Sequence, residues 1–561
     1  FDSLVNQAPD GLRVVFATRA RPRFPLVRLR LRGLLKEIGP PSLAFSLDEM
    51  RRLLDRGRPA EVSLVAQATQ GWPALVSLFS ASLDGEAVDR DRALARWDPL
   101  AFEFIEQTVL APATADLREM LGAAAITEDF CVALASAIGG RDFGGIDAGQ
   151  FDDVEPVVTK SQLGPGWYRL HPLVKRYFAA RHPDGEDALR ARHATASRWF
   201  AAHDFLEQAV AHATEARDFA FAAETIRNAG GVDLLTQVGR MVLERLVEGL
   251  PPEVIFSSPA LSLSHGLILA KHGRLDEARL LLAQLREAPD GQAQLPPSSL
   301  DHIEGIIAIY RDIDIPQLTE RLERKAATLG PQAITDLAWI NVLLCAMYTA
   351  QGRLADARKA VTATILHYRA LKQTYSLIFA HVHLGLIEIL EGNYSSAMEA
   401  SRLAQELIQA SYWNDSELIG ISYVPTAELH YLRGEVEMAE RLLAEAVPGI
   451  ARGEGWGDLY ERAFGTLARA RMRLRGYGAA STVLDAMHKV AQERMLPRLE
   501  LAGDILRTEF LLADGRMEAA ELLAGGTRAR LESLNAGGLQ AWRQQLDFAV
   551  AEARLLLAQQ R

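Results

Sequence analysis

The stretch AKHGRLDEARLLL, residues 270–282, returns in altered form along the C-terminal part of the chain. The related stretches are AQGRLADARKAV (350–361), LEGNYSSAMEAS (390–401), LRGEVEMAERLL (432–443), LRGYGAASTVL (474–484) and ADGRMEAAELL (513–523). Their glycines are 79, 40, 42, 42 and 39 residues apart, and the first step holds a degenerate copy, YRDIDIPQLTERL, in which Asp312 replaces the glycine. A period near 40 residues predicts a stacked array of helix pairs.

Two small residues explain how each copy folds. The glycine suits the left-handed position that ends a helix, and the alanine five residues later lets the next helix pack closely. These alanines are Ala278, Ala357, Ala397 and Ala439. Each pair exposes an apolar face that its neighbours must cover, so copies stack into a superhelix with a concave surface. A plain helical bundle is the alternative. A superhelical surface favours binding over catalysis.

Composition narrows the class of protein. The 561 residues are too many for one core, and 49% hydrophobic with 24% charged residues is typical of a soluble chain. The net charge of −11 argues against a chain-wide nucleic-acid surface. Two cysteines, Cys131 and Cys345, are too few for a disulfide framework and suit a reducing cytoplasm. No charge-free apolar run is long enough to predict a membrane span.

The N-terminal part has a mixed pattern. LRVVFAT at 12–18 follows a Pro-Asp-Gly turn and predicts a buried strand, the tail of an α/β unit. Ser46 and Glu49 predict a capping box. Residues 151–171, with a Gly-Pro-Gly turn at 164–166, predict a small β-wing between helices. From about residue 195 the pattern is helix after helix. The chain starts at Phe1 in what reads as the middle of a domain, so we expect a fragment.

Four segments, in order, resemble the MalT-type activators, large LuxR-family regulators of the STAND class of signal-transduction ATPases. The segments are VVFATRARPRFPLVRLRLRGLLKEIGPPSLAFSLDEM (14–50), VAQATQGWPALVSLFSASL (65–83), YRLHPLVKRYF (168–178) and AAHDFLEQAVAHATEARDFAFAAETI (201–226). The resemblance implies a mainly α fold with four parts. These are the remnant of an α/β nucleotide-binding domain with a helical subdomain (1–95), a winged-helix-like domain (96–190), a helical connector (191–250) and a TPR-like superhelix (251–561).

Two parts of that family are missing from the sequence. There is no GxxxxGK[ST] phosphate-binding loop, and no segment fits a recognition helix. Truncation at both ends and a degenerate relative that never had these parts both remain open. We therefore expect ADP or ATP with Mg²⁺ to bind the full-length protein and not this fragment tightly. DNA would be bound only through a missing C-terminal domain.

The resemblance also assigns nucleotide-binding roles to a few residues. Arg19, after the predicted strand, matches an arginine that senses the phosphates, and Gly71 with Pro73 matches a helix start whose proline lies against adenine. His171 matches the winged-helix histidine that contacts the β-phosphate of ADP. Each has a plain structural alternative: an exposed arginine at a strand end, a simple helix start, and a core or turn histidine. Pro172 fits the first position of the next helix, which makes His171 its cap.

Other candidate residues give weaker evidence for a functional site. The basic group from Arg21 to Lys36 lacks the interleaved aromatics of a nucleic-acid patch, and His381 and His383 point to different helix faces, so no metal site is expected. No HExxH, CxxC or GxSxG motif supports a hydrolase or transferase.

The sequence thus predicts the regulatory and sensor region of a MalT-like regulator. A small-molecule or protein effector would bind the superhelix, ATP would support self-association of the activated protein, and any ATPase activity would be slow. The alternative is a stand-alone TPR-like scaffold for protein partners with a relic nucleotide-binding fold.

Overall fold

The computed structural model describes residues 12–17, 26–54, 59–81, 90–152, 154, 157–181, 185–287, 295, 298–412, 415–452, 456–534, 538 and 540–559. The chain divides into two compact units, residues 1–222 (unit 1) and 223–561 (unit 2). Each unit is described by itself.

Unit 1 is a set of short helices around one small sheet. Its helices are α2 (Leu26–Leu31), α3 (Pro40–Leu43), α4 (Leu47–Leu53), α5 (Pro59–Thr69), α6 (Pro73–Ala81), α7 (Arg90–Phe104), the π-helical η1 (Ile105–Val109), α8 (Ala115–Ala124), α9 (Val132–Gly139), α10 (Ala148–Asp152), α11 (Pro172–Arg181), α12 (Glu186–Ala202), α13 (Leu206–Glu215) and α14 (Phe219–Asn228), whose end extends into unit 2. Its strands are β1 (Asp129–Phe130), β2 (Val158–Lys160) and β3 (Tyr168–Leu170).

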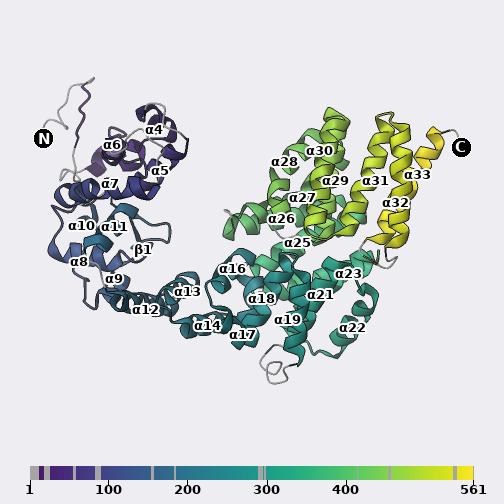
Figure 1. The fold of residues 1–561 in the computed structure, drawn as a ribbon, viewed down its shortest axis with the longest axis horizontal. Coiled ribbons are helices and arrows are strands. Elements are labelled where there is room, and N and C mark those ends of the chain that lie inside the picture. The colour runs from purple at the N-terminus through teal and green to yellow at the C-terminus, as the bar shows by residue number, and fades with distance from the viewer. Residues whose placement is uncertain are drawn as a thin grey trace. The chain divides into compact units, whose positions relative to one another are not determined.

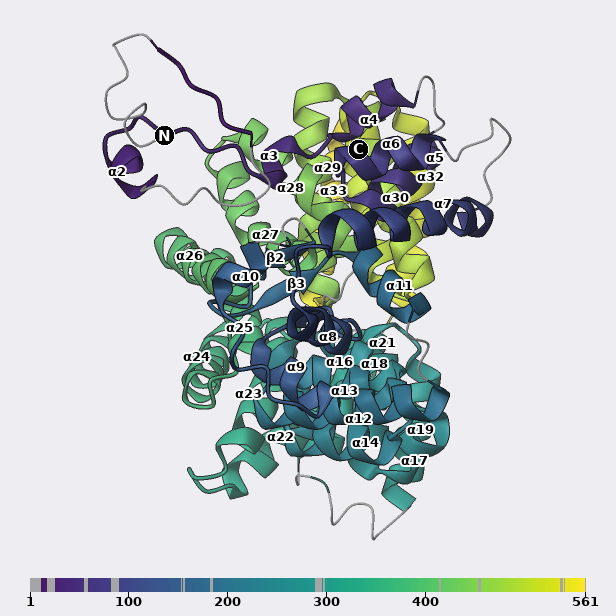
Figure 2. The same cartoon turned by 90° about the vertical axis from the view of Figure 1, so that its left-hand side faces the viewer.

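The sheet confirms the predicted wing. β3 lies between β1 and β2 and is antiparallel to both, with Val158 opposite Leu170. Figure 2 shows β2 beside β3. The Gly-Pro-Gly segment joins β2 to β3, and Gly164 and Gly166 both have positive φ. A single core runs from α4 to α13 and includes the fully buried rings of Phe79, Trp97 and Phe130. The capping box at Ser46 and Glu49 is also present.

The predicted buried strand at 12–18 is wrong for the residues that the structure describes. Residues 12–17 have no regular structure, and all six are exposed, Val15 at 91%. A strand is held by hydrogen bonds to a neighbouring strand. Within the described part of unit 1 the three strands of the wing pair only among themselves. Apolar, β-branched composition alone therefore did not produce a strand here.

Unit 2 is entirely helical in its described residues (Figure 1). Its elements after α14 are the 3-10 turn η2 (Gly231–Asp233), α15 (Leu234–Val238), α16 (Arg240–Glu248), α17 (Pro252–Ser257), α18 (Pro259–Lys271), α19 (Leu275–Glu287), α21 (Ser299–Arg311), α22 (Ile315–Thr328), α23 (Ile334–Ala350), α24 (Leu354–Ala370), α25 (Thr374–Leu390), α26 (Tyr394–Ser411), α27 (Ser416–Leu432), α28 (Val436–Arg452), α29 (Gly457–Arg475), α30 (Tyr477–Glu493), α31 (Pro497–Ala513), α32 (Met517–Ser533) and α33 (Ala541–Ala558).

The repeat works as the sequence predicts. Each quoted stretch is the end of one helix, a turn and the start of its partner, and the glycines at 273, 352, 392, 434 and 515 have φ between +74° and +84°. Asp312 takes the same left-handed position with φ +58°. The alanines Ala278, Ala357, Ala397 and Ala439 are fully buried. Gly476 departs from the rule, because its ψ of −174° makes it a one-residue link between α29 and α30.

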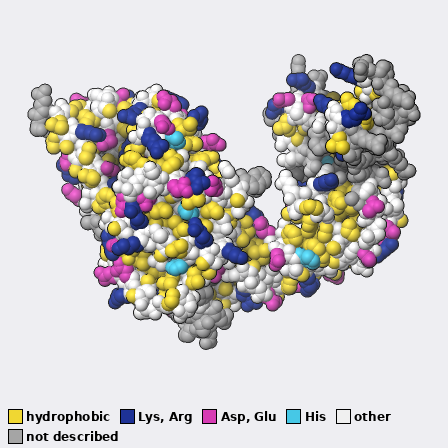
Figure 3. Space-filling view, turned by 180° about the vertical axis from the view of Figure 1, so that it is seen from behind, with side chains coloured by type: hydrophobic (Ala, Val, Ile, Leu, Met, Phe, Trp, Pro, Cys, Tyr) yellow, Lys and Arg dark blue, Asp and Glu magenta, His cyan; other side chains and the backbone are white. Residues whose placement is uncertain are grey.

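Each pair has an inner and an outer helix. α21, α23, α25, α27, α29 and α31 are buried around most of their surface. α21 contacts α23, and α25, α27, α29 and α31 contact one another in series. Their partners, such as α22 and α28, bury one stripe and expose the other. Figure 3 shows charged side chains of both signs spread among apolar ones on one face. Among the described residues no helix is both long and apolar enough to cross a bilayer.

The last helix of unit 2 returns to the early repeats, a feature that the sequence did not predict. The backbone N–H of Gln540 donates to the carbonyl of Ala350 at 3.1 Å, and the indole N–H of Trp542 donates to that of Thr349 at 3.3 Å. Arg498 forms a buried ion pair with Asp312, 186 positions away in the sequence. Early and late repeats are therefore joined directly.

Candidate functional site

The loop between α5 and α6 is held by its own backbone. Thr69 ends α5 fully buried, and its hydroxyl donates to the carbonyl of Val65 at 2.7 Å. The N–H of Gly71 is bonded to that hydroxyl, and the N–H of Trp72 donates to the Thr69 carbonyl at 3.0 Å. Gln70 and Gly71 both have positive φ, which turns the chain sharply into Pro73 at the start of α6.

Gly71 is needed for a close approach. Its carbonyl accepts from the N–H of Phe45 at 2.8 Å, which ties the turn to the segment before α4. A Cβ at this position would lie 2.7 Å from the carbonyl oxygen of Phe45, and the φ of +77° suits glycine alone. The turn is therefore fixed in both shape and position.

His171 joins this turn to the winged-helix domain. It precedes Pro172, and its Nδ1 accepts from the N–H of Leu173 at 3.1 Å, which confirms the predicted cap of α11. Because Nδ1 accepts, the proton of the neutral ring is on Nε2. Nε2 lies 3.2 Å from the carbonyl oxygen of Thr69 and donates to it. Trp72 packs edge-on against the imidazole at 6.0 Å between ring centroids.

This histidine is neutral in the folded chain. It is 7% exposed, and burial lowers its pKa to about 4, helped by the nearby charge of Arg176 and opposed by the bond to Thr69. A neutral imidazole with one donor and one acceptor satisfies both of its partners, whereas a second proton would displace the N–H of Leu173.

A second contact lies one turn further along α11. Arg176 pairs with Asp98 of α7, and its guanidinium lies over the ring of Trp97 at 5.2 Å from the centroid. Burial raises the pKa of the Asp98 carboxyl against the opposing effect of Arg176. Together His171 and Arg176 dock α11 of the winged-helix domain on α5, α6 and α7.

The structure thus brings together three of the four residues singled out from the sequence. Gly71, Pro73 and His171 lie around one turn, and Arg19 lies outside the described residues. Sequence reasoning missed Thr69, because it takes part through its backbone carbonyl, which no residue type signals. It also missed Arg176, whose position four residues after Pro172 on α11 could have marked it.

The described residues do not by themselves form a phosphate site. The N–H groups of Gly71 and Trp72 are bonded to Thr69, and both ring nitrogens of His171 have protein partners. The sequence also has no phosphate-binding loop. The described residues hold no cluster of three His, Cys, Asp or Glu side chains suited to a metal ion.

The geometry defines a class: a helical-repeat protein whose winged-helix domain is docked on a preceding helical subdomain. Residues 105–190 match the MalT winged helix domain family. The chain therefore contains a MalT-type winged-helix domain, which runs from η1 to the first turn of α12.

The chain is similar to curated proteins of two kinds. The chain is 30% identical over 544 residues to the serine/threonine-protein kinase PknK of Mycobacterium tuberculosis, covering 94% of this chain and 48% of the kinase. It is 24% identical over 299 residues to the HTH-type transcriptional regulator MalT of Cronobacter sakazakii, covering 51% of this chain and 33% of the regulator. The chain thus spans about half the length of the kinase and a third of the regulator.

One solved structure aligns along most of the chain. It is a Signal Transduction ATPase with Numerous Domains (STAND) protein with a tetratricopeptide repeat sensor from Pyrococcus horikoshii, at 13% identity and a TM-score of 0.42, covering 91% of this chain and 74% of that one.

Proposed function

We propose that the chain is the regulatory and sensor region of a MalT-like signalling protein. The observation that carries this is the hydrogen bond from His171 to the Thr69 carbonyl, which docks the winged-helix domain on the α5–α6 turn. It links segments 102 residues apart and exists only while the two are docked. We take the docked arrangement as the resting state.

Regulation needs a ligand that prefers one of two arrangements. In this proposal an effector binds the repeats of unit 2, and the docked α11 is released when the protein is activated. ADP or ATP with Mg²⁺ binds the whole protein, where the phosphate-binding loop belongs, and any hydrolysis is slow. Self-association follows activation. The protein works in the cytoplasm.

Hydrogen exchange on this chain tests the docking. His171→Asn keeps an oxygen to cap α11 but cannot reach Thr69, so amides in residues 69–76 and 172–178 should exchange faster than in the wild type. Amides of α9, which packs on α8 and α12, serve as the internal control. Unchanged exchange in both segments would show that His171 does not hold the domain.

The similarity to a protein kinase favours a second candidate, in which the same sensor region controls kinase output. The 30% identity extends over 94% of the chain, further than the similarity to the MalT regulators. The coding sequence that flanks these residues distinguishes the two: a kinase domain supports the second candidate, and a helix-turn-helix domain supports the first.

A further inference from the structure

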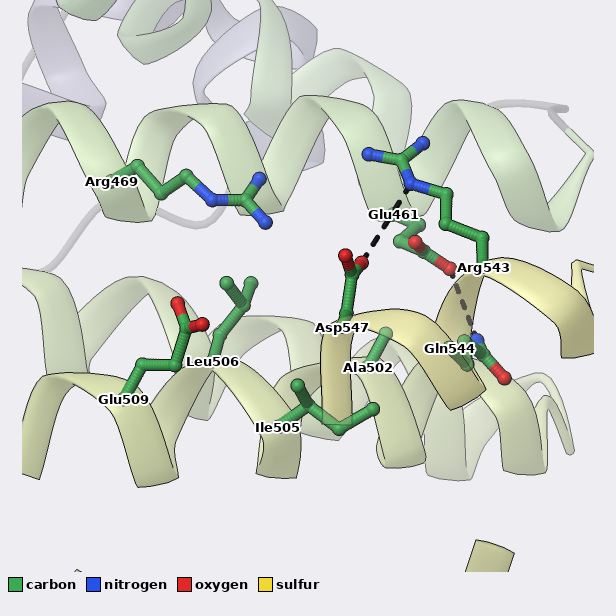
Figure 4. Close-up of a pocket in the computed structure, with 9 residues that line it drawn as sticks. All are labelled: Glu461, Arg469, Ala502, Ile505, Leu506, Glu509, Arg543, Gln544 and Asp547. Carbon is green, nitrogen blue, oxygen red and sulfur yellow. Dashed lines mark hydrogen bonds and ion pairs between the residues drawn. The ribbon is translucent and has the colours of Figure 1, made fainter. Parts of the chain in front are cut away.

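Two adjoining cavities lie where the last repeats of unit 2 meet the early ones. One is partly open to solvent and is lined by residues that include Asp312, Asp458, Arg498 and Gln540. The other lies between α29, α31 and α33 (Figure 4). Glu461 and Gln544 line both cavities.

Gln540 supplies an unsatisfied acceptor. Its side chain lines the first cavity, the residue is only 5% exposed, and among the described residues its Oε1 has no hydrogen-bond partner. Its backbone has a φ of +55° and is fixed by the bond to Ala350. Buried polar atoms are nearly always paired, with protein, water or a ligand. The oxygen therefore calls for a donor in the cavity.

The charges around the cavities call for a cation. The two linings together hold five carboxylates, from Asp312, Asp458, Glu461, Glu509 and Asp547, against three guanidinium groups, from Arg469, Arg498 and Arg543. Asp312 pairs with Arg498, and Asp547 lies 3.7 Å from Arg543. Glu509 lies 3.2 Å from Arg554, a residue outside both linings, so the excess is one negative charge.

Two of these carboxylates are left with less compensation. Asp458 has a contact of 3.8 Å to His383, and burial lowers the pKa of that imidazole against the opposing effect of Asp458. Glu461 accepts from Gln544 at 3.1 Å, and burial raises its pKa in spite of Arg543.

We propose that this double cavity binds a small organic amine. An ammonium group provides a further positive charge beside Glu461 and Asp458, which share Arg543 with Asp547, and the N–H donors that Gln540 Oε1 needs. Since Asp312, Arg498 and Gln540 also join early and late repeats, the bound amine would stabilise that junction. The inference rests on the proposed function, for which it names the class of effector.

Calorimetric titration of the full 561-residue chain tests the site, with butane-1,4-diamine as the probe and butane-1,4-diol as its uncharged counterpart. Saturable binding of the diamine, at least tenfold tighter than of the diol, is expected. Glu461→Gln should weaken diamine binding at least tenfold, and so should Gln540→Leu. Glu518→Gln, an exposed position on α32, should change it less than twofold.

In these variants the melting temperature distinguishes a loss of folding from a loss of diamine binding. Glu461→Gln removes a buried carboxyl and should melt no lower than the wild type, so lost binding reports on the site. A diamine that binds no tighter than the diol, or equally in Glu461→Gln and wild type, overturns the proposal. A water-filled cavity gives the first of these results. Neither outcome tests the docking role of His171, which the hydrogen-exchange comparison tests separately.

Discussion

At the scale of single residues, the site depends on two geometric requirements. Gly71 allows the turn to approach Phe45, and His171 caps α11 with one nitrogen while donating to Thr69 with the other. The sequence could identify both residues from short motifs. It could not show that Nε2 meets a backbone carbonyl, because that contact depends on how two distant segments pack.

Gly71→Ala should destabilise unit 1 by more than the cost of placing an alanine at positive φ, because its Cβ would also clash with Phe45. A Cβ would meet Phe45 at 2.7 Å, so about 2–4 kcal/mol of unfolding free energy should be lost. Gly33→Ala is the matched control, because Gly33 has a similar φ of +66° with open space around it, and should cost about 1 kcal/mol. Equal losses in urea unfolding would show that the contact with Phe45 is unimportant.

His171 should also make stability depend on pH. Its pKa is about 4 when folded and 6.5 when unfolded, so the unfolded chain takes up the proton first as pH falls. Its contribution is complete above pH 6.5 and is lost progressively towards pH 4, about 2 kcal/mol of it by pH 5. In His171→Asn, the unfolding free energy should fall by about that much less between pH 6.5 and pH 5. The other buried histidines, such as His212, titrate in both proteins, so parallel curves for the two would refute the assignment.

At the scale of helices, the repeat was the most predictable part of the molecule. Glycine at the turn and a small residue five positions on are local requirements that recur in the six copies with glycine, so periodicity exposes them, whereas the copy with Asp312 has Gln317 at the second position. The strand predicted at 12–18 failed because a strand needs a neighbour that its own composition cannot supply.

The small-residue rule predicts different effects at adjacent positions of α32. Ala520 is fully buried against its neighbours, and Ala519 is exposed. Ala520→Leu should cost about 1–3 kcal/mol by overpacking, whereas Ala519→Leu should stay within about 0.5 kcal/mol of wild type. Chemical unfolding of the two variants measures this. A tolerated leucine at 520 would mean that close packing of the pair is not required.

At the scale of the whole molecule, the contact between early and late repeats could not be predicted from the sequence. Asp312 was recognised as a turn residue, and its partner Arg498 has no signal in the repeat pattern. The pair forms only because the stacked helices bring positions 186 apart together. Such contacts arise from the accumulated rotation of the array, which the sequence period does not specify.

The central claim is that the docked winged-helix domain is the resting state. The most direct measurement is the effector-free output of the full-length protein carrying His171→Asn, as transcription or kinase activity according to its output domain. Losing one buried hydrogen bond of about 1–2 kcal/mol should raise that output roughly tenfold and weaken ADP binding by a similar factor. His203→Asn, at an exposed histidine that ends α12, should leave both unchanged. Unchanged output and ADP affinity with a lowered melting temperature would contradict the account and make His171 a structural residue only.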